Sequence, residues 1–323
     1  MESQNTHTVI DNRGLLQALI GDGRSLLSFT GLSLVLAGSF ALFLAATGHF
    51  LPHDLQFLRM TVEELCLIND CRIVHFMVHD RTAFGGALIS IGLLYLWLAE
   101  FPLRRGEAWA WWLFALSGLL GFGSFLAYLG YGYLDTWHGL ATLLLLPCFG
   151  LGLARSSKLL PKPLQLRALF KPALPLSWNS ALGLGRICLL GVAIGMIAGG
   201  LTILIVGTTI VFVPQDLRYM NLSPADLDRI NPRLIPLIAH DRAGFGGAIL
   251  TTGVVVLFSV WCGPPSRSLW QVLALAGTTG FATAVGVHPA VGYNDFIHLA
   301  PAYLGAIVFF VGLALCYKPM TSA

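Results

Sequence analysis

Long apolar stretches separated by shorter polar segments run along the whole chain. Eight of them approach the ~20 residues that a helix needs to cross the hydrocarbon core of a bilayer. They lie at 27–50, 83–100, 109–129, 136–153, 187–212, 243–262, 269–287 and 296–316. Hydrophobic residues make up 56% of the sequence and charged residues 11%, and the mean hydropathy is +0.75, which is unlike a soluble domain. The pattern predicts an all-α integral membrane protein with eight transmembrane helices in contact with the lipid bilayer.

The chain also contains a duplicated unit. Two polar clusters recur, one 161 and the other 160 residues later: HDRTAFGGAL at 79–88 returns as HDRAGFGGAI at 240–249, and Asp135 with His138 returns as Asp295 with His298. Each repeat holds four spans, and an even number of spans makes the two repeats run parallel. We predict two tandem parallel four-helix bundles, the first over 27–153 and the second over 187–317.

Charge placement predicts the orientation. If the spans alternate, 12 lysines and arginines but only 5 acidic residues fall on the N-terminal side, against 7 and 11 on the other side. Because basic residues collect on the cytoplasmic side, we expect both termini, the segment 1–26 and the basic linker 154–186 to be cytoplasmic. The N-terminal segment lacks the layout of a cleaved signal, and a bacterial inner membrane is the expected location. No basic run with interleaved aromatic residues indicates nucleic-acid binding.

Two polar outer segments, 51–80 and 213–241, are too long to be simple turns. Each contains the spacing of a capping box, which starts a short helix: Thr61 with Glu64, and Ser223 with Asp226. We therefore expect each segment to fold as a lid over its own bundle.

Cys66 and Cys71 both lie in the first of these segments, on the side that is oxidising in a bacterial periplasm. A spacing of five on one continuous helix would point the two sulfur atoms apart. A disulfide between them therefore requires the helix to break near Asn69 and Asp70.

Glycines at positions 191, 195 and 199 recur with a spacing of four on the fifth span. Small residues at this spacing let another helix approach closely. They indicate either the seam between the two halves or ordinary helix packing.

The repeated clusters place histidine and aspartate at one depth near the outer face. We expect them at the outer starts of the second and fourth spans of each half: His79, Asp80, Asp135 and His138 in the first, and His240, Asp241, Asp295 and His298 in the second. The second and fourth spans of an up-down bundle lie diagonally across it, with their axes roughly 13 Å apart. The two histidines of one half can therefore hold a ligand between them. Three further histidines have no counterpart in the other half and are expected at the surface: His53, His75 and His288.

Three kinds of chemistry suit these residues. Two neutral imidazoles can bind the iron of a haem, with Arg81 or Arg242 beside its propionates. The same histidines also suit a non-haem iron or zinc site, to which the aspartates contribute as ligands. The candidate catalytic carboxylates are Asp80, Asp135, Asp241 and Asp295. A transporter, or a protein in which the clusters only fix helix ends, remains the third alternative.

This layout resembles the haem A synthase family, which has eight spans from a duplicated four-helix bundle, a histidine on the second and fourth span of each half, and a cysteine pair in the first outer loop. The resemblance covers most of the chain in topology. It implies two haem-ligand pairs and an outer redox pair: His79 with His138, His240 with His298, and Cys66 with Cys71. The family's glutamate three residues before the first histidine is Phe76 in this chain, so the acidic group beside a haem would be Asp80 or Asp135.

The sequence therefore favours a haem-binding membrane protein with two outer-facing sites under loop lids. Such a protein would act as an oxidoreductase on a hydrophobic small molecule or pass electrons to a partner. A non-haem iron or zinc enzyme that uses the same residues is the alternative.

Overall fold

The computed structural model describes residues 14–126, 133 and 136–322 of the 323-residue chain. Within these residues eight helices are long and apolar enough to cross a membrane, and no strand occurs. They are α2 (Arg24–Thr47), α5 (Arg72–Leu98), α6 (Ala108–Leu126), α7 (Thr136–Ser156), α8 (Ala181–Thr208), α11 (Leu234–Cys262), α12 (Arg267–Val291) and α13 (Phe296–Thr321). The predicted class, an all-helical membrane protein with eight spans, is confirmed.

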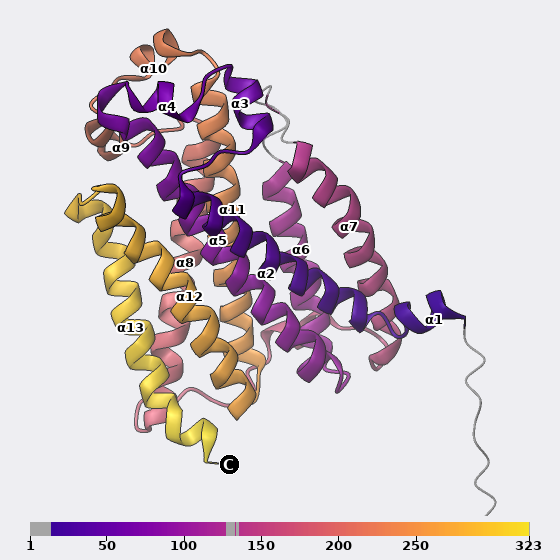
Figure 1. Ribbon diagram of the computed structural model, residues 1–323. Helices are drawn as coiled ribbons and strands as arrows, with labels where there is room; N and C mark the ends of the chain where they lie inside the picture. The colour runs from indigo at the N-terminus through magenta and orange to yellow at the C-terminus, as the bar shows by residue number, and fades with distance from the viewer. Residues whose placement is uncertain (1–13, 127–132, 134–135, 323) are drawn as a thin grey trace, which may run out of the picture.

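The second span of each half forms the centre of the molecule. Within the 18-residue apolar stretch of each span, 67% of the residues of α5 and 78% of those of α11 are buried. The share is 17–39% in the other six spans. The two central helices pack against each other, and Figure 1 shows α6 and α7 on one side of them and α12 and α13 on the other. A helix that is apolar all round is stable when neighbours cover all of its faces, and α5 and α11 have this composition.

The halves interlock and do not form one bundle each, which corrects the prediction of two tandem bundles. The central α5 packs against α12 of the second half, and α11 packs against α6 of the first half. Glycines make these crossed contacts close: a Cβ at Gly86 would lie 2.8 Å from the Cβ of Thr283, and Gly247 faces Ser124 in the same way. The Phe-Gly-Gly element of each repeat thus receives a helix from the other repeat.

Glycine pairs also join the first and second span within each half. A Cβ at Gly85 would lie 2.9 Å from the carbonyl oxygen of Gly38, and a Cβ at Gly246 would lie 2.9 Å from that of Gly200. The glycines on the fifth span were expected to admit a neighbouring helix, and this prediction is wrong. A Cβ added at Gly191, Gly195 or Gly199 would have no other atom within 4 Å.

Four short helices cover one end of the bundle, which we call the capped end. They are α3 (Pro52–Leu58), α4 (Val62–Cys66), α9 (Pro214–Met220) and α10 (Pro224–Ile230). Both expected capping boxes are present, at Thr61 with Glu64 and at Ser223 with Asp226. The hydrogen bonds from Ser223 lower the pKa of the Asp226 carboxyl. The same hydrogen bonds fix the start of α10.

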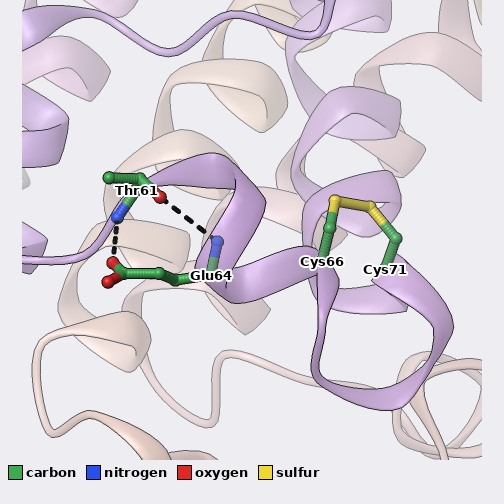
Figure 2. The surroundings of a disulfide bond; sticks show 4 residues. All are labelled: Thr61, Glu64, Cys66 and Cys71. Atoms are coloured by element: carbon green, nitrogen blue, oxygen red, sulfur yellow. Dashed lines mark hydrogen bonds between the residues drawn. A yellow bond between two sulfur atoms is a disulfide. The ribbon is translucent and has the colours of Figure 1, made fainter.

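A disulfide joins Cys66 to Cys71, as Figure 2 shows beside the capping box of α4. Three consecutive residues from Asn69 to Cys71 have positive φ angles, so the helix breaks where the bond requires it. The side chain of Asn69 donates a hydrogen bond to the carbonyl of Met220, and the Arg72 guanidinium donates one to that of Tyr219 at 3.2 Å. The disulfide loop of the first half is therefore docked on α9 of the second.

Both central spans begin earlier than the sequence pattern indicated. No proline or glycine interrupts the residues between Arg72 and His79, and α5 extends through them. Similarly, α11 begins at Leu234, six residues before His240. The repeated histidines therefore lie about two helical turns inside the bundle, below the capped end.

The linker between the halves is folded against the opposite end. Short 3-10 turns occur at Ser157–Leu159 and Leu166–Phe170, and α8 begins at Ala181. Arg186 belongs to α8, where it is buried and donates a hydrogen bond to the carbonyl of Leu174 at 3.0 Å.

Replacing Gly85 by alanine should destabilise the fold, because the added methyl group collides with the backbone of α2. Overpacking of this kind costs about 1–3 kcal/mol. The matched control is Gly191→Ala, where nothing lies within 4 Å. Thermal unfolding in detergent should show a lower midpoint for the first variant only. Equal midpoints would mean that α2 and α5 are not in close contact.

Candidate functional site

Three histidines from three helices meet below the capped end. His79 of α5, His288 of α12 and His298 of α13 each offer a ring nitrogen, and these three atoms lie within 4.8 Å of one another. The Nε2 atoms of His79 and His288 are 3.0 Å apart. His298 stacks on Tyr293, with ring centroids 4.4 Å apart and planes inclined by 18°. In the part of the chain that the structure describes, this is the one group of three side chains with metal-ligand geometry.

Asp80 determines which nitrogen of His79 carries the proton. Its Oδ1 lies 2.9 Å from Nδ1 of His79, and both side chains are buried. A carboxylate accepts the Nδ1 proton, so the neutral ring presents a lone pair at Nε2 toward the other two histidines. This pairing of a carboxylate with a histidine is the usual support of a metal-ligating imidazole.

The separation between the nitrogens of His79 and His288 can be compared with that of ligands to a small ion and to a haem. A tetrahedral zinc ion with bonds of about 2.0–2.1 Å places its ligand nitrogens about 3.4 Å apart, close to the separation of 3.0 Å between His79 and His288. Two axial ligands of a haem stand about 4 Å apart on opposite sides of a flat ring. His79 and His288 leave no such gap, because their Nε2 atoms are at hydrogen-bond distance.

A second histidine pair occupies the equivalent place in the other repeat. Nδ1 of His138 in α7 lies 3.0 Å from Nε2 of His240 in α11. Tyr133 packs edge-on against His240, with centroids 5.1 Å apart, and Tyr293 lies against His79 with tilted rings at 5.4 Å. The sequence position that corresponds to His288 is Tyr128, which lies outside the described residues.

An arginine of the second half binds two aspartates behind the three histidines. Arg242 is 2.6 Å from Asp216 of α9 and 3.1 Å from Asp80 of α5, and all three side chains are buried. The same guanidinium donates to the carbonyl of Val211 at 2.7 Å and lies over the ring of Phe76. Asp80 therefore connects His79 to the second half of the chain.

The other repeat has the same network with the halves exchanged. Arg81 of α5 is 2.9 Å from Asp54 of α3 and 2.8 Å from Asp241 of α11. Tyr133 donates a hydrogen bond to Asp54, and Tyr293 donates one to Asp216 at 2.8 Å. Burial, followed by the nearby Asp216 charge, raises the pKa of Tyr293, so this phenol stays protonated and remains a donor at neutral pH.

The structure brings the repeated histidines together across the halves. The expected pairing of His79 with His138, and of His240 with His298, is wrong, because the central spans exchange partners. His288 was expected at the surface but is 4% exposed and belongs to the cluster. Arg81 and Arg242 are paired with aspartates and not directed to the outer edge.

The four candidate carboxylates have different places. Asp80 and Asp241 are in the arginine networks. Asp295 caps α13 by accepting the backbone N–H of His298 at 2.9 Å, so it positions that histidine. Asp135 lies outside the described residues.

Sequence reasoning missed Asp54 and Asp216, each of which binds an arginine of its own repeat. The signal was present, because Pro52-His-Asp-Leu returns as Pro214-Gln-Asp-Leu 162 residues later. It also assigned no role to Tyr133 and Tyr293, although both precede the repeated Asp-x-x-His motif by two residues.

No protein-family model matches the chain, and comparisons with curated proteins and with solved structures also found no match.

Replacing Arg242 by glutamine should destabilise the protein strongly. Two buried carboxylates then lose their counter-ion, and breaking a buried pair costs about 3–5 kcal/mol. The control is Arg229→Gln, which removes an exposed pair with Asp226 at 3.3 Å. Chemical unfolding should show a large loss of stability for the first variant and none for the second. Similar stabilities for both variants would contradict the network.

Proposed function

We propose that the protein is a membrane metalloprotein that binds one divalent transition-metal ion through His79, His288 and His298. One observation carries this proposal: three buried or half-buried imidazoles converge from three helices, and a carboxylate holds the first of them with its lone pair directed inward. Three neutral imidazoles suit zinc or copper, whereas non-haem iron enzymes usually add a carboxylate ligand.

The charges around the three histidines support a cation. Arg242 carries one positive charge, and Asp80 and Asp216 carry two negative charges, so this buried group has an excess of one negative charge. An uncompensated charge in a membrane protein interior is costly, and a nearby metal ion offsets it. Tyr293 and Arg242 both donate hydrogen bonds to Asp216.

Such an ion would supply an open coordination position and a water molecule of lowered pKa. The protein residues have their own parts: Asp80 orients His79, Asp295 fixes the start of the helix that carries His298, and Tyr293 packs against the ring of His298. The excess of basic residues at the opposite end supports a capped end on the outer side of the membrane. The bound metal would then be supplied from outside the cytoplasm.

Metal analysis of the purified protein tests the proposal. Wild type should contain about one zinc or copper ion per chain, as a three-histidine site holds a single ion. His288→Gln and His298→Gln should each lose most of it, while His75→Gln should retain it. His75 is half-buried, lies one turn before His79 on the same helix and is outside the cluster, so it is a matched control.

An absorption spectrum of the same samples separates the alternatives. A haem Soret band that disappears in His79→Ala would show that a haem occupies the site in place of an ion. Protein that contains neither metal nor haem would sink both cofactor proposals, and lowered stability of the histidine variants would then indicate a structural cluster.

A further inference from the structure

The second histidine pair borders a cavity of about 70 Å³ between α2, α5, α7 and α11. About 10–15 Å³ of such volume holds one water molecule, so this space can take a small ring or head group. We propose that it binds the flat, carbonyl-bearing head of a lipid-soluble compound of the quinone class. This site uses other residues than the three-histidine cluster and does not depend on the metal proposal.

The polar edge of the cavity favours a ligand that accepts hydrogen bonds. Arg81, His138 and His240 line it, together with Asp54 and Asp241. Both carboxylates form ion pairs with the guanidinium of Arg81, at 2.9 and 2.8 Å. Arginine has five N–H groups in a rigid fork and can donate to a ligand while it holds both aspartates. A carbonyl oxygen is the matching acceptor.

Two aromatic rings make the remaining wall suitable for a flat group. The rings of Phe84 and Phe125 lie 6.3 Å apart with planes inclined by 23°, and both border the cavity. Each also packs edge-on against His138, with centroids 6.3 and 4.6 Å apart. Aromatic faces favour stacked or offset contacts with another flat ring, which a quinone head provides.

The apolar side of the cavity is formed by a peripheral helix. Ala41 and Leu44 of α2 line it, and only 17% of the most apolar window of α2 is buried. In α7, which carries His138, 17% of the corresponding stretch is also buried. Both helices therefore face lipid over most of their surface. A hydrophobic tail can therefore remain in the bilayer while the head occupies the cavity.

Gly244 keeps the space open. A Cβ at this position would meet only the Phe84 ring, at 3.7 and 3.8 Å, which is ordinary contact, so a longer side chain would extend into the cavity that this residue lines. The corresponding residue of the first repeat is the larger Ala83. Filling the space from α11 is thus a direct way to block a ligand.

Binding is tested with the full chain in lipid nanodiscs, using a decyl-tailed benzoquinone and, as a probe without carbonyl groups, decylbenzene. Titration calorimetry should show saturable binding of the quinone and none of decylbenzene. Gly244→Leu should weaken quinone binding at least about tenfold, which corresponds to 1.4 kcal/mol. The matched control is Gly150→Leu on α7, where no atom lies within 4 Å of a Cβ and binding should be unchanged.

A second variant, Ala41→Phe, fills the cavity from the lipid side and decides the result if Gly244→Leu does not fold. It should also weaken quinone binding about tenfold. The proposal is overturned if wild type does not bind the quinone, if decylbenzene binds as tightly, or if both cavity-filling variants bind like wild type.

Discussion

The fold depends on two crossed arginine–aspartate networks that join the halves of the chain. Arg81 of the first half binds Asp241 of the second, and Arg242 of the second binds Asp80 of the first. Each arginine also binds an aspartate on the short helix of its own half, α3 or α9. Unpaired buried charges are costly in a membrane protein, and Asp80 and Asp241 each find their arginine in the other half.

The crossed pairing explains why each histidine group contains residues of both halves. Arg and Asp are next to the repeated His on one helix, so exchanging their partners also turns His79 toward α12 and α13, and His240 toward α7. The short helices at the capped end complete each network from above. The disulfide loop adds a further crossed contact through Asn69, which reaches the end of α9.

Duplication produced two similar places that have since diverged. One has His288 as a third imidazole and suits an ion, and the other has a glycine, Gly244, beside an open space. Differences at two repeated positions, His288 and Gly244, thus distinguish the two proposed sites. The shared parts are the arginine, its two aspartates and the tyrosine that donates to one of them.

Composition and periodicity were sufficient to predict the eight spans, because the length of a transmembrane helix is set by the bilayer. Capping residues also predicted the starts of α4 and α10 correctly. The partners of α5 could not be predicted, since every span is apolar and the pattern of one helix does not name its neighbours. His288 has no counterpart in the other repeat and was therefore expected at the surface. Its place in the cluster depends on how α12 packs, which the sequence pattern does not indicate.

Aspartates at 54 and 216 were predictable in principle, because they recur within a repeated Pro-x-Asp-Leu motif. Their role was not predictable, as it depends on short helices folding back over the central spans. The central claim about this structure is therefore that the two halves exchange helix partners.

A cross-link between the halves tests that claim most directly. Gly86 and Thr283 would be replaced by cysteine in a chain whose other cysteines are serine, with a protease site in the linker. A Cβ at Gly86 lies 2.8 Å from that of Thr283, so a small shift permits a disulfide. After oxidation and cleavage, the two halves should migrate as one species on a denaturing gel and separate on reduction. Separation without reduction would contradict the interlocked arrangement.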